Sequence, residues 1–115
     1  MEYFYVFPSN KTVHVGEVAT FECKFNGLPD TVEWVKYYEM NGSSLNEFGV
    51  PYMKRVQYRS INHIKANQLT LQNVTFDDAG KYACVISNNF GNCQQYTWLT
   101  VLPKPVTGEL HINSD

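Results

Sequence analysis

The chain has 115 residues and a formal net charge of −2, with 43% hydrophobic and 17% charged residues. This length suits one domain with a single core, and the composition excludes a disordered chain. Nine Lys and Arg residues against eleven Asp and Glu argue against the concentrated basic face of a nucleic-acid-binding protein. No apolar run has the length needed to cross a bilayer.

The first part of the chain predicts short strands separated by turns. Residues 3–7 and 12–15 predict one edge strand broken by Pro8, because proline cannot donate to a ladder. Residues 18–25 and 31–38 alternate between apolar and polar side chains and predict two further strands. The residues expected on their core side are Ala19, Phe21, Cys23, Phe25, Val32 and Trp34.

The middle of the chain is less regular. Residues 50–58 predict a strand that Pro51 confines to the edge of a sheet, and residues 60–67 predict a polar loop or a short edge strand. Residues 68–72 alternate cleanly, and Val74 continues their buried set.

The last two strands are predicted at residues 81–87 and 94–102, joined by a hairpin tip at 88–92. We place the domain at residues 1–103 and a tail or linker at 104–115. The residues expected in the core from these strands are Tyr82, Cys84, Ile86, Thr97, Leu99 and Val101.

The segment 78–84 fits the pattern D-x-G-x-Y-x-C of a tight corner that leads into a buried strand. A Tyr two residues before a Cys is typical of the tyrosine corner of immunoglobulin sandwiches, which predicts a second Cys on the opposite sheet and a Trp against the bridge. Cys23 precedes Cys84 by 61 positions, and Trp34 follows Cys23 by 11. The sequence therefore predicts an all-β, two-sheet immunoglobulin-like sandwich of the I-set type with one disulfide, Cys23–Cys84.

A local excess of positive charge comprises Lys54, Arg55, Arg59 and Lys65. We interpret it as an ordinary solvated surface, since isolated surface charges contribute little. The alternative is that these residues make a weak contact with a sulfated polysaccharide such as heparan sulfate. We also expect one of the last three to pair with Asp78 at the corner.

The predicted disulfide and three N-x-S/T sequons indicate an extracellular or secreted protein. The sequons predict glycosylation at Asn10, Asn41 and Asn73. The first residues do not resemble a signal peptide, so we expect an extracellular domain that was cut from a longer chain.

Cys93 is left over from the predicted pair. One interpretation is a half-shielded, inert thiol at the base of the hairpin. The alternative is an intermolecular bridge or a reactive thiol.

From Pro8 to Leu102 the sequence resembles the third, membrane-proximal immunoglobulin domain of the fibroblast growth factor receptors. The Asn-Gly-Ser turn, the Val-Pro-Tyr segment and the final Trp-Leu-Thr-Val-Leu are more specific to that family than the corner. The segments that carry the resemblance are 32–36, 41–43, 50–52, 71–80, 88–91 and 98–102.

The resemblance implies the extracellular module of a single-pass plasma-membrane receptor tyrosine kinase, which binds a growth factor and dimerises, with the kinase elsewhere in the parent chain. In that family the domain contacts its ligand through the F-G hairpin and the C′-E segment. The implied ligand-binding residues are Asn88, Asn89, Phe90, Gly91, Gln57, Arg59, Ile61 and His63. The chain departs from the family at Glu33, where a Gln is common, at Cys93, and in lacking the preceding basic linker, so the isolated domain is expected to bind weakly.

Phe90 has a physical case of its own, because an exposed aromatic on a rigid hairpin is a typical binding group. The alternative is that Phe90 folds back onto the sheet. A competing function is an adhesion or spacer domain that pairs through the face carrying Tyr96 and Trp98, although a neighbouring strand or domain covering Trp98 is the blander interpretation. A decoy receptor that lacks a kinase is a third candidate function.

An enzyme is not predicted. His14, His63 and His111 have no metal-ligand spacing, and the adjacent Asp77 and Asp78 belong to the corner. No cofactor or metal is implied.

Overall fold

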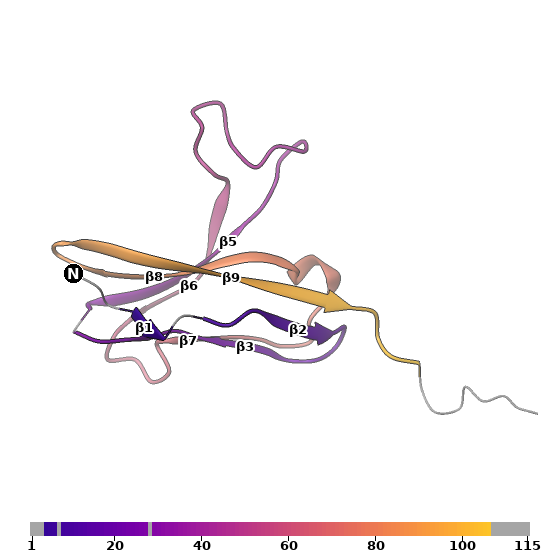
Figure 1. Ribbon diagram of the computed structural model, residues 1–115, viewed down its shortest axis with the longest axis horizontal. Helices are drawn as coiled ribbons and strands as arrows, with labels where there is room; N and C mark the ends of the chain where they lie inside the picture. Colours follow the sequence, from indigo (N-terminus) through magenta and orange to yellow (C-terminus); the bar gives the residue numbers. More distant parts are fainter. Residues whose placement is uncertain (1–3, 7, 28, 107–115) are drawn as a thin grey trace, which may run out of the picture.

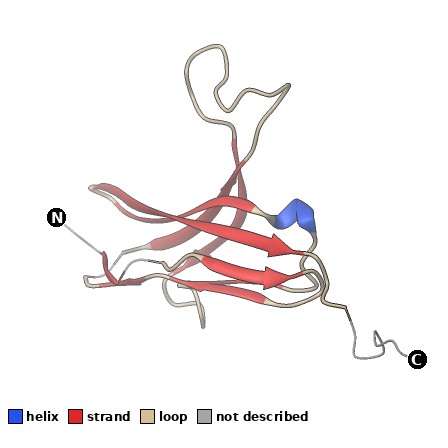
Figure 2. Cartoon of the chain, turned by 45° about the vertical axis from the view of Figure 1, so that its right-hand side comes forward, coloured by secondary structure: helices blue, strands red, loops and turns tan. Residues whose placement is uncertain are grey.

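The computed structural model describes residues 4–6, 8–27 and 29–106 as two packed layers of strands (Figure 1, Figure 2). One layer is a five-stranded sheet in the order β2-β9-β8-β5-β6, and the facing layer holds the pairs β1-β4 and β3-β7. The elements are β1 (Phe4–Val6), β2 (Lys11–His14), β3 (Ala19–Glu22), β4 (Lys24–Phe25), β5 (Thr31–Tyr37), β6 (Met53–Ser60), β7 (Gln68–Leu71), the 3₁₀ helix η1 (Phe76–Asp78), β8 (Gly80–Asn88) and β9 (Gly91–Leu102).

The chain changes layers at its first proline. β1 pairs antiparallel with β4, whereas β2 pairs in parallel with β9 of the other layer. Pro8 is buried between them and has no N–H to give to either ladder. The predicted broken edge strand is therefore two strands in different layers. Tyr3 and Phe7, which we expected in the first of them, lie outside the described residues.

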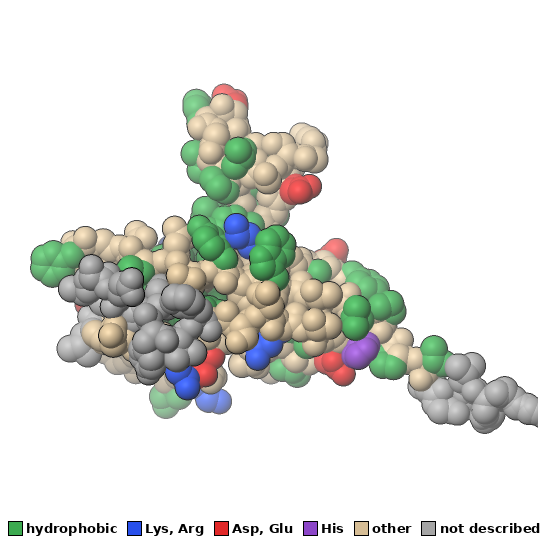
Figure 3. Space-filling model, in the orientation of Figure 1, with side chains coloured by type: hydrophobic (Ala, Val, Ile, Leu, Met, Phe, Trp, Pro, Cys, Tyr) green, Lys and Arg blue, Asp and Glu red, His purple; other side chains and the backbone are tan. Residues whose placement is uncertain are grey.

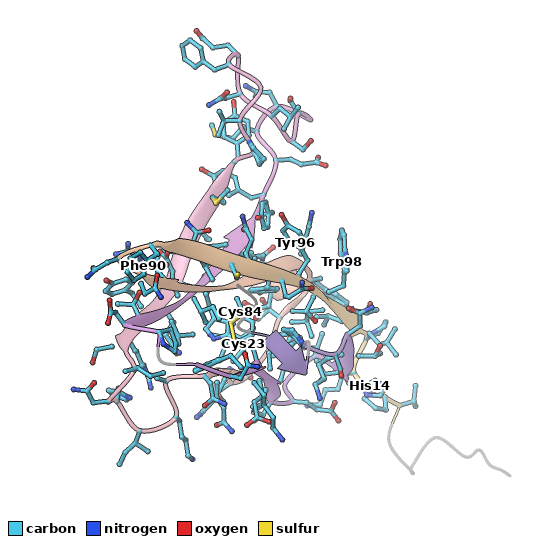
Figure 4. The ribbon with its side chains drawn as sticks, turned by 60° about the vertical axis from the view of Figure 1, so that its left-hand side comes forward. His14, Cys23, Cys84, Phe90, Tyr96 and Trp98 are labelled. Atoms are coloured by element: carbon cyan, nitrogen blue, oxygen red, sulfur yellow. A yellow bond between two sulfur atoms is a disulfide. The ribbon has the colours of Figure 1, made fainter. Side chains whose placement is uncertain are left out.

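A disulfide between Cys23 and Cys84 joins the two layers, with Cα atoms 6.7 Å apart (Figure 4). Trp34 lies beside Cys84 on the neighbouring strand, and both are fully buried. Phe21 of the facing layer packs against Trp34 and Tyr82, with ring centroids 6.1 and 5.7 Å apart. The predicted bridge and its tryptophan are confirmed.

The alternation of the strands also places the core as predicted. Phe25 and Val101 are only partly buried, but both pack against the core cluster. The other expected core residues are almost completely buried: Ala19, Val32, Leu69, Val74, Ile86, Thr97 and Leu99.

The corner before β8 is held by Tyr82, whose hydroxyl donates to the backbone oxygen of Asp78 at 2.6 Å. The Asp78 carboxylate accepts the N–H of Thr75 at 2.8 Å. The expectation that Asp78 pairs with Arg55, Arg59 or Lys65 was wrong, because its carboxylate closes the first turn of η1. The nearby basic group is Lys36, which donates to the backbone oxygen of Asp77.

The segment between β5 and β6 projects away from the sheet (Figure 1). Met40 and Ser43 exchange two backbone hydrogen bonds of 2.9 Å within it. Further along, Asn46 Oδ1 accepts the N–H groups of Phe48 and Val50 at 2.8 and 3.0 Å. We call residues 38–52 the projecting loop.

The projecting loop takes up the start of the strand expected at residues 50–58, so β6 begins only at Met53. Pro51 makes an isolated bridge with Leu45 inside the loop. β6 lies at the edge of its sheet, as the proline predicted.

Replacing both Cys23 and Cys84 by Ala should lower the free energy of unfolding by about 4 kcal/mol, because the bridge closes a separation of 61 residues. Thermal melting measures the loss. Cys93→Ala is the matched control and should cost no more than about 1 kcal/mol. A double variant that melts like the wild type would contradict the pairing.

Burial, and then the nearby Asp78 carboxylate, raises the pKa of Tyr82 to about 12. An unfolded tyrosine titrates at about pH 10, so the stability linked to this proton is present below that pH and is lost as the pH rises toward 12. Tyr82→Phe removes this component, and it also removes a hydrogen bond worth about 1 kcal/mol at neutral pH.

Urea unfolding at neutral pH and across the alkaline range checks this prediction. The Phe variant should be less stable at neutral pH and should lose less stability with rising pH than the wild type. The exposed Tyr58→Phe is the control. Equal alkaline slopes for the Tyr82 variant and the wild type would show that the prediction is wrong.

Candidate functional site

One end of the five-stranded sheet brings three segments of the chain together. The N–H of Asp30 donates to the backbone oxygen of Ser87 at 2.7 Å, and the N–H of Ile61 donates to that of Asp30 at 3.0 Å. These backbone hydrogen bonds therefore connect three segments at one edge: the hairpin between β8 and β9, the entry to β5, and the loop after β6. We call this edge the end rim, made of residues 29–30, 59–67 and 87–91.

The hairpin of the end rim turns in only two residues, Asn89 and Phe90, because the strands stay paired as far as Asn88 opposite Gly91. This corrects the five-residue tip predicted at 88–92. Gly91 has φ +142°, a conformation that favours glycine. The side-chain oxygen of Asn88 accepts the N–H of Phe90 at 2.8 Å and holds the turn from one side.

Phe90 points into solvent at the tip, with 91% of its surface exposed (Figure 4). The alternative in which its ring folds back onto the sheet is wrong. The hydrogen-bonded two-residue turn fixes the backbone that carries the ring, which lowers the backbone entropy lost on binding.

The four candidate residues of the C′-E segment divide into two pairs. Gln57 Nε2 donates to the backbone oxygen of Gln68 at 2.7 Å, across to the facing layer, and Ile61 packs against the core cluster. Arg59 Nη1 lies 3.1 Å from Nδ1 of the exposed His63. Arg59 and His63 thus face each other at the end rim, whereas Gln57 and Ile61 are turned toward the interior.

Two residues of the end rim, Ile64 and Asp30, were not among the individual binding residues predicted from the sequence. Ile64 is 80% exposed beside His63, and Asp30 provides the backbone link between the two sides of the rim. Ile64 falls in a segment that we treated as polar, so its apolar surface had no periodic pattern to mark it.

The outer face of the five-stranded sheet carries a second group of aromatic residues. The rings of Tyr37 and Tyr96 are 5.8 Å apart, and Lys81 Nζ lies 4.9 and 4.1 Å from their centroids. Burial, and then a hydrogen bond with Tyr96, raises the pKa of Tyr37 to about 12. Trp98 is 52% exposed next to them, so the alternative in which strands cover it is wrong.

A groove of about 590 Å³ lies where the projecting loop meets this face. Hydrophobic side chains gather along the loop and on the face beside it (Figure 3). The groove is lined by Tyr37, Tyr38, Leu45, Pro51, Tyr96 and Trp98 among others. The groove could not be predicted from the sequence, since its lining comes from residues 37–51 and 79–98, at least 28 positions apart, and the loop has no regular pattern.

Some of the basic residues that are grouped in the sequence at positions 54–65 have partners in the structure. Arg55 donates to the carboxylate of Glu33, and its guanidinium lies 4.4 Å from the ring centroid of Tyr58. Arg59 faces His63, as described above. Glu33, which departs from the family pattern, is therefore neutralised by a strand neighbour.

The three sequons lie on different parts of the surface. Asn10, Asn41 and Asn73 are all exposed, and the last two have φ +52°. Cys93 is half-buried, lies opposite Ile86 and packs against the core.

Within residues 4–6, 8–27 and 29–106, no group of three or more His, Cys, Asp or Glu side chains is arranged to hold a metal ion. His111 lies outside this part of the chain. In the same part, no helix has the length and apolar character needed to span a membrane.

Residues 2–101 match the immunoglobulin I-set domain model, and the chain belongs to that family. This is a non-catalytic fold, in agreement with the prediction that the domain is not an enzyme.

Among known proteins, fibroblast growth factor receptor 1 of Xenopus laevis is 38% identical over 98 residues, which cover 83% of this chain. The chain spans 12% of that receptor's length. The predicted resemblance to this receptor family is confirmed.

Solved structures support the fold. A chain of the titin–obscurin-like 1 immunoglobulin complex is 25% identical with a TM-score of 0.62, and the match covers 91% of this chain and 97% of that one. The twitchin kinase region of Caenorhabditis elegans is 28% identical with a TM-score of 0.56, and the match covers 88% of this chain and 16% of that one.

The division of the C′-E residues predicts different effects of substitution. Gln57→Ala should lower the free energy of unfolding by about 1 kcal/mol, because it removes a half-buried hydrogen bond between the layers. His63→Ala should change it by no more than about 0.5 kcal/mol. Urea denaturation measures both. Equal losses would contradict the assignment of Gln57 to the interior.

Proposed function

We propose that this chain is an extracellular, ligand-binding immunoglobulin module of a growth factor receptor tyrosine kinase, and that its end rim contacts a fibroblast growth factor. The parent is a single-pass plasma-membrane protein that dimerises on signalling, with the kinase elsewhere in its chain. The similarity to fibroblast growth factor receptor 1 supports this class of parent. We further propose that the domain comprises residues 1–103 and is followed by a linker.

The observation that carries the proposal is the position of Phe90, which is 91% exposed on a turn fixed by Asn88 and Gly91. A large exposed apolar side chain on an ordered turn is the kind of group that dominates protein interfaces. Ile64, 80% exposed on the other side of Asp30, extends the apolar surface of the rim.

Polar groups flank these apolar contacts. Arg59 and His63 lie on the β6 side of the rim, and Asn89 lies beside Phe90 in the turn. A protein ligand at the rim therefore meets both apolar and hydrogen-bonding groups, a mixture found in specific interfaces. Asn88, Gly91, Gln57 and Ile61 act in this proposal by holding the rim in shape.

Heparan sulfate is at most a weak partner in this proposal. Lys54 and Lys65 are exposed, but Arg55 is engaged by Glu33. A strong anion-binding surface needs several cations directed at one partner.

An adhesion or spacer domain is the second candidate. The exposed aromatic residues of the outer face favour it, with Tyr96 46%, Trp98 52% and Tyr58 52% exposed. Contiguous exposed apolar surface often marks a protein contact.

Phe90→Ala in the extracellular part of the parent receptor should weaken growth factor binding about 10- to 30-fold, the effect of losing a central contact. His63→Ala should weaken binding by a smaller factor. Surface plasmon resonance gives the dissociation constants, and thermal melting confirms that folding is unchanged.

Phe48→Ala is the matched control, because Phe48 is also a highly exposed phenylalanine, 80% exposed, but lies in the projecting loop. It should bind like the wild type. Unchanged affinity of the Phe90 variant would remove the end rim from the account. Loss of affinity in the Phe48 variant alone would move the contact to the projecting loop.

A further inference from the structure

The side chain of Asn10 is fixed against strand β9 before β2 begins. Its Oδ1 accepts the backbone N–H of Trp98 at 3.0 Å and lies 3.5 Å from Oγ1 of Thr97. Because an N–H can only donate, the atom it meets must be the amide oxygen, which fixes the orientation of the amide group. Nδ2, the atom that carries an N-linked glycan, is therefore directed away from the backbone of Trp98.

Asn10 begins a sequon that ends at Thr12, and its side chain is exposed. The attachment point thus lies within one hydrogen bond of the residue whose indole is the largest exposed ring of the outer face. Tyr96 and Trp98 stand on the same side of β9 (Figure 4), and Trp98 is 52% exposed. The other two sequons have no such neighbour among their described hydrogen bonds.

We propose that an N-linked glycan on Asn10 packs its first sugar against the indole of Trp98 and covers that end of the outer aromatic face. The face of an indole carries negative charge density, and the C–H bonds of a sugar ring are weakly positive, so stacking is favourable. The fixed amide of Asn10 limits the directions that the glycan can take, which lowers the entropy lost on stacking. The inference rests on the proposed passage of the chain through the secretory pathway.

A glycan on Asn10 affects the surfaces of the two candidate functions differently. Trp98 lies seven residues along β9 from Gly91, about 23 Å at the rise of an extended strand. A glycan at Asn10 therefore covers part of the groove and of the outer face but leaves the end rim open. It disfavours pairing through Tyr96 and Trp98 and does not hinder a ligand at Phe90.

The test uses the fluorescence of the two tryptophans in the chain. Trp34 is completely buried, so quenching by iodide reports on Trp98. The whole chain is secreted from eukaryotic cells behind a cleavable leader, and peptide mass spectrometry records the occupancy of each sequon. Thr12→Ala removes the sequon and keeps the hydrogen bonds of Asn10. Asn73→Asp, which removes another sequon, is the matched control.

The Stern–Volmer constant for iodide should be about twofold higher in the Thr12→Ala protein than in the wild type, because the glycan covers one of the two faces of the indole. The Asn73→Asp protein should match the wild type. Trimming the glycan to its first sugar should keep the protection.

Equal quenching of wild type and Thr12→Ala would overturn the inference, and so would an unoccupied Asn10. Protection that disappears when only the outer sugars are removed would also overturn it, since the first sugar is the one assigned to Trp98. None of these results bears on growth factor binding, which the Phe90 variant tests separately.

Discussion

The constraint on which the rest of the structure depends is the joining of the two layers at Cys23 and Cys84, with Trp34 packed beside the bridge. Within the part of the chain that the structure describes, the buried indole N–H of Trp34 has no hydrogen-bond partner, which costs about 1–3 kcal/mol. Complete burial of a tryptophan removes 150–250 Å² of surface from water, worth about 4–6 kcal/mol. Apolar contact therefore outweighs the unpaired donor, and the interior stays closed around the bridge. Phe21 contacts both Trp34 and Tyr82 across the two layers.

This fixed centre lets the strand ends carry the surface that we propose for recognition. β5 and β8 remain paired from Trp34 and Cys84 to Thr31 and Ser87, so the rim is a direct extension of the most buried part of the sheet. Phe90 is consequently exposed on a backbone that the paired strands and the hydrogen bond to Asn88 hold in place. The outer face of the same sheet, in contrast, is partly covered by its own tyrosines and, in our account, by a glycan. In these two proposals one sheet has an open end for a ligand and a side that a glycan shields.

The sequence predicted the elements whose chemistry depends on spacing alone. The Cys, Trp and Tyr positions of the sandwich core are fixed by alternation along a strand and by the needs of one disulfide, and each was found where expected. The sequence could not tell that Gln57 and Ile61 face inward, because β6 is an edge strand with polar side chains on both faces and the loop that follows it has no periodic pattern. It also assigned Asp78 to a basic partner, whereas the carboxylate accepts a hydrogen bond from the nearby backbone N–H of Thr75. At Asp78 a hydrogen bond to a residue three positions away formed in place of an ion pair with a distant strand.

The most direct test of the central claim, that a rigid rim at one end of a disulfide-joined sandwich meets a protein ligand, is amide hydrogen exchange of the parent receptor with and without bound growth factor. The account predicts slower exchange on binding at residues 59–67 and 87–91, and no change at residues 38–52 and 94–98. Slower exchange confined to residues 94–98 and the projecting loop, with none along the rim, would contradict it.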